Sequence, residues 1–451
     1  MFQVFVDRKL ELAVLEEEYK RDRASFAIIY GRRRVGKTEL IRKFIEGKKG
    51  VYYLADERGY ERNLREFQKV VERELEITDF SLIQYGSWVD VLKRVAEMFQ
   101  DTRIVLAVDE FPYLVEKGVL SEFQKAWDLY LSNTKIFLIL IGSSVSMMTR
   151  LTLDYSSPLY GRRTMQLKVE KMKFWDAWKL MPSYTYMDFL KIYAAVDGIP
   201  HYLVQMDQNK GAEENIKEML LRKDRVLYEE AEILLRMEFR EFQRYFSILH
   251  AISNGKRRFS EIADITGMDS GTLSKYLSVL QECGLVKEEK PLFGKKKMRR
   301  YKLADNYFTF WFRFVYSNKN PLEIGKIDVV WNQIKEDFYT YLGRVYEEII
   351  FDLYSFLYPE RVCGQWWNRE GEEIDILAID EKNKLAVCGE VKLGKINRQD
   401  LEKLKEKASR IQELKEFEKK YLLVGKEVEV KESKNVEIWT LKEVEKRILE
   451  L

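Results

Sequence analysis

GRRRVGKT, residues 31–38, follows the apolar run SFAIIY at 25–30 and precedes ELIRKFI at 39–45. The order of strand, G-x-x-x-x-G-K-T and helix is that of a phosphate-binding loop. Its main-chain N–H groups can turn toward phosphates, Lys37 can supply charge to the β and γ positions, and the Thr38 hydroxyl can hold Mg²⁺. The sequence therefore predicts a site for ATP or ADP with Mg²⁺. The residues expected to contact the nucleotide here are Gly31, Arg34, Val35, Gly36, Lys37, Thr38 and Glu39.

Two further apolar runs end in polar residues that suit this loop. The run at 103–108 leads into Asp109 and Glu110, and the run at 136–141 leads into Gly142, Ser143 and Ser144. We expect Asp109 to hold Mg²⁺ with Thr38, and Glu110 to orient or deprotonate the attacking water. Ser143 and Ser144 are candidate sensors of the γ-phosphate, while the alternative for the acidic pair is a solvated turn.

A pair of arginines follows in PLYGRR, residues 158–163. A guanidinium delivered to a γ-phosphate stabilises transition-state charge, so Arg162 is a candidate catalytic residue. If Arg162 or Arg163 acts in a neighbouring copy, a homo-oligomer is required. A basic surface turn is the alternative.

Composition limits the class of protein. The chain has 451 residues, of which 46% are hydrophobic and 33% charged, with a formal net charge of +3. These values describe globular material of several domains. An apolar run of about 18 residues, or the layout of a signal peptide, is not found, so we expect a cytoplasmic protein without membrane contact. The three Cys have no C-x-x-C spacing, which argues against a disulfide framework or a zinc site.

Several segments together resemble the archaeal ATPase family, a STAND-like branch of the AAA+ ATPases related to origin-recognition ATPases. They are GRRRVGKT, FVDRKLEL at 5–12, VDEFPYL at 108–114, SPLYGR at 157–162 and GIPHYL at 198–203. The resemblance extends over residues 1 to about 300. It implies that Arg8 lies near the adenine and that Pro200 belongs to a helical lid over the nucleotide. Lys9 departs from the pattern, because the family usually has Glu there.

Residues 245–305 read as three short helices and a hairpin, the order of a winged helix. We expect helices at 246–253, at 261–266 capped by Ser260, and at 271–283 capped by Ser270. The third helix presents small polar residues and a lysine that can lie in a major groove. Its hairpin, the wing, carries eight Lys or Arg against two Glu, which predicts phosphate contacts. The expected DNA contacts are Thr272, Ser274, Lys275, Lys295, Lys296, Lys297, Arg299 and Arg300. A packing or dimerisation module is the alternative.

Acidic residues and a lysine mark the last part of the chain. Strands are expected at 362–367, 373–379 and 385–391, with Asp375 on the second and Glu390 at the end of the third. Strand alternation places Glu390 and Lys392 on one face. Carboxylates there suit Mg²⁺, with Lys392 orienting a water or stabilising a charged phosphorane.

With a helix opening at 342–348, a helix at 398–415 and a strand at 420–424, this region resembles the PD-(D/E)XK nuclease fold. The resemblance implies that Glu347 is the helix acid, Asp375 the strand acid, and Glu390 with Lys392 the E-x-K pair. It thereby implies a metal site of Glu347, Asp375 and Glu390, with Asp375, Glu390 and Lys392 catalytic. Surface charge, or a site that binds without cutting, remains open.

The sequence predicts an α/β P-loop AAA+ core with a helical lid, a winged helix-turn-helix domain and a C-terminal α/β restriction-endonuclease-like domain. The expected bounds are 1–165 for the core, 166–240 for the lid, 241–318 for the winged helix and 319–451 for the last domain. We expect an ATPase that binds DNA and acts as an ATP-regulated, Mg²⁺-dependent nuclease in genome processing or defence. The alternative is a non-cleaving DNA-binding or signalling ATP switch.

Overall fold

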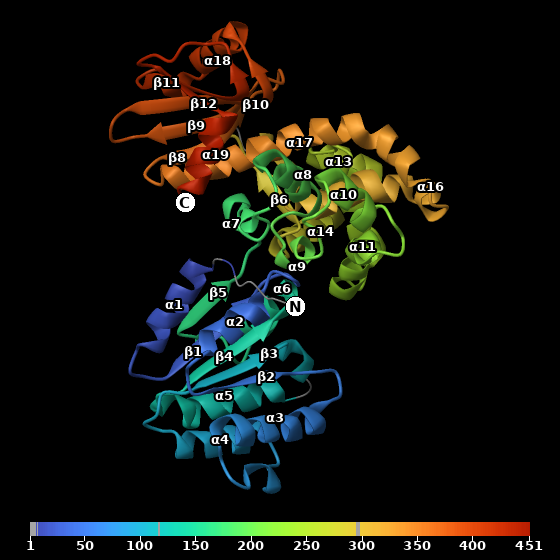
Figure 1. The fold of residues 1–451 in the computed structure, drawn as a ribbon. Helices are drawn as coiled ribbons and strands as arrows, with labels where there is room; N and C mark the ends of the chain where they lie inside the picture. Colours follow the sequence, from blue (N-terminus) through green and yellow to red (C-terminus); the bar gives the residue numbers. More distant parts are fainter. Residues whose placement is uncertain (1–5, 7, 116–117, 295–297) are drawn as a thin grey trace. The chain divides into compact units, whose positions relative to one another are not determined.

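The computed structural model describes residues 6, 8–115, 118–294 and 298–451. The chain forms two compact units (Figure 1). The first unit comprises Met1–Met172 with Ile199–His201, and the second comprises Lys173–Gly198 with Tyr202–Leu451.

A parallel five-stranded sheet in the order β2-β3-β4-β1-β5 forms the centre of the first unit. The strands are β1 (Ser25–Tyr30), β2 (Gly50–Leu54), β3 (Val105–Asp109), β4 (Phe137–Gly142) and β5 (Met165–Lys168). Tyr30 is in register with Gly142, and Leu54 with Asp109, so the loops that follow these strands leave from one edge of the sheet.

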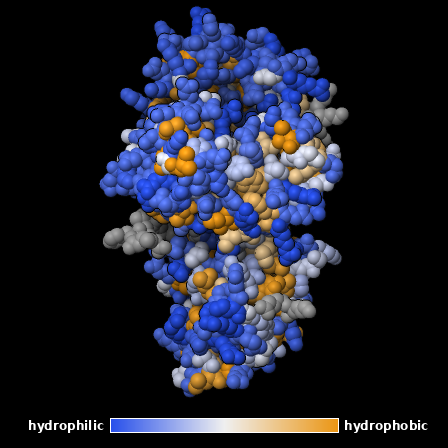
Figure 2. All heavy atoms as spheres, turned by 90° about the vertical axis from the view of Figure 1, so that its right-hand side faces the viewer, coloured by the Kyte–Doolittle hydropathy of each residue, from blue (hydrophilic) through white to orange (hydrophobic). Residues whose placement is uncertain are grey.

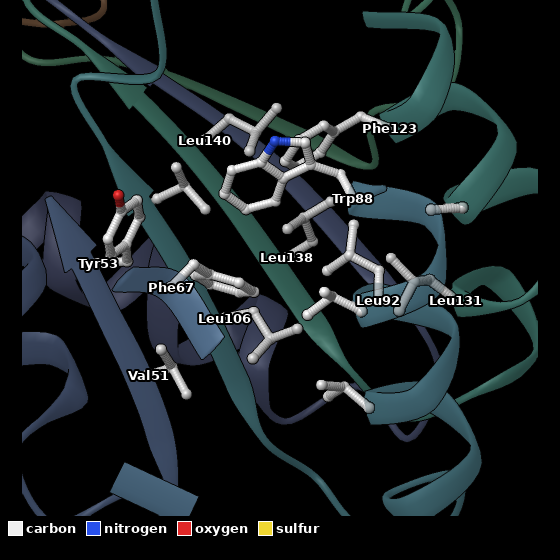
Figure 3. Close-up of a cluster of buried hydrophobic side chains, with 14 of the residues drawn as sticks. Val51, Tyr53, Phe67, Trp88, Leu92, Leu106, Phe123, Leu131, Leu138 and Leu140 are labelled. Atoms are coloured by element: carbon white, nitrogen blue, oxygen red, sulfur yellow. The ribbon is translucent and has the colours of Figure 1, made fainter. Parts of the chain in front are cut away.

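Helices cover both faces of this sheet (Figure 1). They are α1 (Lys9–Tyr19), α2 (Lys37–Ile45), α3 (Tyr60–Leu75), α4 (Trp88–Met98), α5 (Val119–Leu129) and the short α6 (Val145–Met148). A continuous core joins the strands to α3, α4 and α5, where Phe67, Trp88 and Phe123 pack over Leu106 and Leu138 (Figure 3). Because this core fixes β3 and β4 against each other, it also fixes the polar residues at their ends.

The second unit begins with helices that correspond to the predicted lid and winged helix. They are α7 (Phe174–Trp178), α8 (Tyr186–Val196), α9 (Pro200–Leu203, which begins in the first unit), α10 (Ala212–Leu220), α11 (Val226–Glu238), α12 (Phe242–Ser253), α13 (Phe259–Thr266) and α14 (Ser270–Glu282). The hairpin of β6 (Val286–Glu289) and β7 (Arg300–Leu303) is antiparallel. The connection to the last sheet runs through α15 (Asn306–Phe310), α16 (Lys319–Glu323) and α17 (Ile327–Leu357).

A mixed sheet in the order β12-β11-β10-β9-β8 completes the second unit. Its elements are β8 (Val362–Trp367), β9 (Glu373–Asp380), β10 (Leu385–Ile396), α18 (Arg398–Arg410), β11 (Glu418–Val428), β12 (Val436–Thr440) and α19 (Leu441–Leu449). The pairs β8–β9 and β9–β10 are antiparallel, whereas β10, β11 and β12 are parallel. The helix α17 spans 31 residues, and its Tyr341 hydroxyl donates to the carbonyl of Ala194 in α8.

Several element bounds differ from the sequence prediction. Asp269, not Ser270, caps α14, because its carboxylate accepts from the N–H groups of Gly271 and Thr272. Likewise α13 begins at Phe259, before Ser260, and the Glu261 carboxylate accepts from the N–H groups of Arg257 and Arg258 at its start. The strand β5 extends beyond residue 165, the predicted end of the ATPase core, because it pairs with β1.

The visible face in Figure 2 is mainly hydrophilic, which agrees with the 33% of charged residues in the sequence.

Candidate functional site

The phosphate loop leaves β1 and enters α2 as predicted. The buried Lys37 ammonium donates to the carbonyl oxygens of Gly31 at 2.8 Å and Arg32 at 2.9 Å, so it lies over the loop. A Cβ at Gly31 would overlap the carbonyl oxygen of Val169, which explains why the first loop position is glycine. The loop thus has the close packing that a phosphate cradle needs.

The metal-binding pair predicted at this site is brought together. Thr38 Oγ1 donates to Asp109 Oδ2 at 2.7 Å, and Asp109 is buried. A hydroxyl and a carboxylate oxygen at this spacing fit the hard oxygen ligands that Mg²⁺ prefers. The structure therefore places at one point the two side chains that would hold the ion.

Sequence reasoning missed Tyr52, on β2. Its hydroxyl donates to the same Asp109 Oδ2 at 2.6 Å. Burial and the neighbouring Asp109 charge raise the pKa of Tyr52, so the phenol stays protonated and acts as a donor. The sequence gives little indication of this role, because the run GVYYL at 50–54 does not end in a polar residue as the other two runs do.

Glu110 and Ser143 are joined directly. Ser143 Oγ donates to Glu110 Oε1 at 2.6 Å, and the Glu110 N–H donates to Asp109 Oδ1 at 2.8 Å. Glu110 adopts a positive φ of 50°, which directs the main chain away from the strand it follows. Ser144 instead caps α6, where its hydroxyl accepts from the Met147 N–H. Ser143 is thus the better placed of the two predicted sensors.

Arg8 and Pro200 lie against the phosphate loop. The buried Arg8 guanidinium donates to the carbonyls of Val35 at 2.7 Å and Glu170 at 2.8 Å. Pro200 Cγ is 4.0 Å from the position of a Cβ at Gly36. Both residues therefore reach the loop from segments far away in the sequence.

Arg162 is paired with an aspartate, and among the described residues it has no hydrogen bond to the phosphate loop. Its guanidinium forms two hydrogen bonds of 2.8 Å with the Asp128 carboxylate, at the end of α5. It also donates to the carbonyls of Pro158 and Tyr160. A role toward a γ-phosphate would require that Arg162 leave Asp128.

The predicted DNA contacts fall into three groups. Ser274 and Lys275 are exposed on α14 and Thr272 is half-buried there, with its hydroxyl donating to Asp269. On the wing, Arg299 pairs with Glu288 at 2.8 Å, and Arg300 pairs with Glu373 of the C-terminal sheet. The predicted contacts Lys295, Lys296 and Lys297 lie outside the described residues.

The C-terminal carboxylates approach one another as neighbours of one sheet and one helix. Asp375 Oδ2 accepts from the Val391 N–H at 2.8 Å, which joins β9 to β10 beside Glu390. Burial and the Glu390 charge raise the pKa of Asp375 to about 7. Burial and the Asp375 charge raise the pKa of Glu347, on α17, to about 8. Both pKa values are raised because the ionised carboxylates are buried and repel one another, and a bound cation would relieve this repulsion.

Two lysines of the C-terminal domain pair with Glu390, one of the three predicted metal-binding carboxylates. Lys407 on α18 lies 3.1 Å from Glu390 Oε2. Lys392 lies 3.9 Å from Glu390 Oε1 and 2.6 Å from Asp400 Oδ1. In the described part of the chain, three or more acidic, His or Cys side chains do not converge closely enough to hold a metal ion. The donor chemistry suits a hard cation, but Glu347, Asp375 and Glu390 are not gathered around one point.

The first unit defines the class of protein. A parallel sheet, a phosphate loop and an acidic strand end are those of a P-loop ATPase, and an ATPase domain predominantly from Archaea matches residues 5–206. The chain belongs to the family of the uncharacterized protein MJECL04 of Methanocaldococcus jannaschii. The two are 34% identical over 446 residues, which cover 95% of this chain and 97% of that protein. These findings confirm the predicted archaeal ATPase resemblance.

Other similarities are more local or more distant. An uncharacterized ATP-binding protein of the same organism, MJ0423, is 56% identical over 46 residues, covering 10% of this chain and 78% of that protein. The solved structure of a Walker-type ATPase of Pyrococcus abyssi aligns with a TM-score of 0.53 at 23% identity, covering 68% of this chain and 96% of that one. The similarity to the Walker-type ATPase concerns the fold alone.

Two family matches lie in the second unit. The bacterial regulatory protein family arsR matches residues 246–288, which confirms the predicted helix-turn-helix region. A family described as archaeal and bacterial proteins of unknown function matches residues 311–404. The nuclease-like assignment of this region stays a prediction. Among the described residues, none of the helices is both long enough and apolar enough to cross a membrane.

Proposed function

We propose that this protein is an ATP-hydrolysing switch that binds duplex DNA and cuts it at the C-terminal acidic site when Mg²⁺ is bound. The observation that carries the proposal is the pairing of Asp375 with the Val391 N–H beside Glu390. This hydrogen bond joins β9, which carries Asp375, to β10, which carries Glu390. The charge of Asp375 in turn acts on Glu347 of α17 and on its pKa.

In the first unit, the residues divide the work of hydrolysis. Lys37 would turn from the loop carbonyls to the β and γ phosphates, while Thr38 and Asp109 would hold Mg²⁺. Glu110, oriented by Ser143, is the residue that aligns the attacking water. Mg²⁺ supplies charge stabilisation to the phosphates when it is bound.

DNA binding is assigned to α14. Its Ser274 and Lys275 are exposed, as a recognition helix requires, and the region belongs to the arsR-type helix-turn-helix match. Lys275 would contact phosphate, and the small Ser274 would allow the helix to approach the groove. Lys295, Lys296 and Lys297 remain proposed phosphate contacts.

Cutting is assigned to Glu347, Asp375, Glu390 and Lys392. The strand order, with an antiparallel β8–β9–β10 followed by α18 and the parallel β11, supports the proposed PD-(D/E)XK relationship. Glu347, Asp375 and Glu390 would have to draw closer together to hold Mg²⁺, which would activate a water and stabilise phosphoryl charge when bound. Lys392, beside Glu390, would donate to the phosphate oxygens once it leaves Asp400.

A second function, DNA binding without cutting, is favoured by two observations. Lys407 lies 3.1 Å from Glu390, and the three carboxylates do not form a group that could hold a metal ion in the described chain. In that case the acidic site would serve folding or partner binding, and nucleotide state would govern DNA affinity alone.

The experiment incubates supercoiled and linear DNA with Mg²⁺ or Mn²⁺, with and without ATP. It compares wild type with Asp375→Asn, Lys392→Ala and Lys37→Ala. Lys395→Ala is the matched control, because Lys395 lies on the same strand but pairs with the exposed Glu429. Cutting by wild type and Lys395→Ala that is lost in Asp375→Asn and Lys392→Ala supports the nuclease, and a changed rate in Lys37→Ala supports ATP control. DNA bound but uncut by wild type supports the second function.

A further inference from the structure

The chain leaves the second unit for only three residues and then returns to it. Residues up to Gly198 belong to the second unit, Ile199–His201 to the first, and residues from Tyr202 onward to the second again. We define the connector as residues 197–202. Because the chain passes from one unit to the other near both ends of the connector, a displacement of its middle acts on both ends.

The middle of the connector lies against the phosphate loop. Pro200 Cγ is 4.0 Å from the position of a Cβ at Gly36, the second glycine of the loop. Burial and the charge of Arg34, which is also in the loop, lower the pKa of His201. A nucleotide bound at the loop would therefore act on Pro200 and His201.

Both ends of the connector hold the same helix, α15. At the first end, the buried Asp197 carboxylate accepts from the N–H groups of Gly198 at 2.7 Å and Asn306 at 2.8 Å. At the second end, the Tyr202 ring packs on the Tyr307 ring, with 4.7 Å between the ring centres, and both rings are buried. Asn306 and Tyr307 are the first two residues of α15, so the two ends of the connector meet at the start of this helix.

Asp197 has a backbone conformation that residues with side chains rarely adopt. Its φ of 62° and ψ of −171° lie in a region that is populated almost only by glycine. Such a conformation costs free energy and persists only where the surroundings fix it. Here the two hydrogen bonds that the carboxylate accepts fix it. Loss of these bonds would let Asp197 turn to an ordinary conformation, so this end of the connector has two available states.

The helix α15 leads to the winged helix and to α17. Two residues separate it from β7 of the wing. Its continuation, Trp311–Val315, places the Phe312 ring against that of Phe246 in α12, with 4.8 Å between the ring centres. The Tyr341 hydroxyl of α17 donates to the carbonyl of Asn306 at 3.3 Å. A displacement of α15 therefore acts on the helix-turn-helix region and on the helix that leads to the C-terminal sheet.

We propose that Asp197 and Tyr202 form a clamp on α15, which transmits the nucleotide state of the phosphate loop to the DNA-binding region. A shift of Pro200 on a change of nucleotide draws Asp197 out of its strained conformation and releases the start of α15. Asp197 and Tyr202 are positioning residues, because they act through α15. The inference rests on the proposed ATP switch and names the residues that regulate it.

The test measures the affinity of the full-length protein for a labelled duplex, with ADP and with a non-hydrolysable ATP analogue. The ratio of the two dissociation constants reports the coupling between the nucleotide site and the DNA site, and DNA must change nucleotide affinity by the same factor. A substitution that only weakens the fold changes both affinities together and leaves their ratio as it was.

Two variants open the clamp, one at each end. Asp197→Gly removes both hydrogen bonds and also the strain, and Tyr202→Leu removes the ring that packs on Tyr307. Asp305→Asn is the matched control. Asp305 caps the same helix by accepting from the Phe308 N–H, and Asn is an equally good capping residue.

The wild-type protein should bind the duplex with affinities that differ by at least about fivefold between the two nucleotides. In Asp197→Gly and in Tyr202→Leu this ratio should fall below about twofold, although both nucleotides still bind. Asp305→Asn should keep the wild-type ratio. Wild-type ratios in Asp197→Gly and Tyr202→Leu overturn the proposal. An equal loss in Asp305→Asn also overturns it, because any change at the start of α15 would then have the same effect.

Thermal unfolding by circular dichroism accompanies each protein. If Asp197→Gly does not fold, Asp197→Asn takes its place; it keeps one acceptor oxygen for two N–H groups and should lose part of the ratio. A wild-type protein that responds to nucleotide, with variants that respond equally, refutes the clamp alone. Equal wild-type affinities with both nucleotides refute the ATP switch, and the clamp with it.

Discussion

Tyr52→Phe removes one hydrogen bond at the centre of the nucleotide site and changes little else. The Tyr52 hydroxyl and Thr38 Oγ1 donate to the same oxygen of Asp109, at 2.6 and 2.7 Å. Asp109 Oδ1 accepts from the Glu110 N–H at 2.8 Å. In the variant, Thr38 and the Glu110 N–H still satisfy the carboxylate, so no buried charge is left without a donor.

The expected cost follows from the charge of the acceptor. A hydrogen bond to a charged group contributes about 1.5–3 kcal/mol to stability, against about 0.5–1.5 kcal/mol for a neutral pair. Tyr53→Phe is the matched control, because Tyr53 lies next in β2 and donates to the neutral Asn63 amide oxygen at 2.7 Å. For a unit of this size, Tyr52→Phe should lower the melting temperature by about 3–12 °C.

Differential scanning calorimetry measures the stability of both variants, and a phosphate-release assay measures ATP hydrolysis. Tyr52→Phe should also slow hydrolysis by about tenfold, which corresponds to about 1.4 kcal/mol of lost orientation at Asp109. Tyr53→Phe should leave hydrolysis unchanged. Equal losses of stability and unchanged hydrolysis in both variants would refute the role assigned to Tyr52.

The remaining predictions concern the arginine beyond β4, the recognition helix and the wing. Arg162→Ala should lower the rate of ATP hydrolysis, whereas Asp128→Asn, which releases the Arg162 guanidinium, should not. Because the Arg162–Asp128 pair is partly exposed, either substitution should change the free energy of unfolding in urea by less than about 1 kcal/mol. Lys275→Ala should weaken duplex binding at every sequence and reduce the slope of log affinity against log salt by about 1, measured by fluorescence anisotropy; an unchanged slope would exclude a phosphate contact. Glu289→Gln should destabilise the second unit by about 3 kcal/mol at pH 7, because it breaks the ion pairs that the largely buried Glu289 makes with Lys302 and Arg257. Burial raises the pKa of Glu289, but the charges of Lys302 and Arg257 outweigh burial and keep this pKa below 4.5. The stabilisation is therefore present above pH 4.5 and disappears as the pH falls through the lowered pKa; a difference between variant and wild type that persists at pH 3 would contradict the assignment.

Local signals were sufficient to predict the nucleotide site. The loop at 31–38 and the acidic end of the 103–108 run contain their chemistry within a few residues, and parallel strands bring such ends to one edge. Thr38 and Asp109 are 71 residues apart in the chain yet share a hydrogen bond. Tyr52 could not be predicted, because its role depends on β2 pairing with β3 and not on any pattern around residue 52.

The wing shows what sequence reasoning cannot supply, namely the partners that its cations meet after folding. Its cations were predicted to contact DNA from their number alone, but Arg300 and Lys302 pair with Glu373 and Glu348, far along the chain. The same applies to Arg162, whose partner Asp128 lies on another helix. Counts of charge cannot distinguish a solvated cation from one that an acidic neighbour holds after folding. The predicted strand at 362–367 has the bounds of β8, and that at 373–379 ends one residue before β9 does, since alternation and apolar content are local signals.

The most direct test of the account is the affinity of the full-length protein for a labelled duplex, measured with ATP, with ADP and without nucleotide, for wild type and Lys37→Ala. If nucleotide bound at the phosphate loop governs what the second unit does to DNA, the wild-type affinity changes between ATP and ADP, whereas that of Lys37→Ala is the same in all three conditions. Equal wild-type affinities in ATP, in ADP and without nucleotide would contradict the ATP switch.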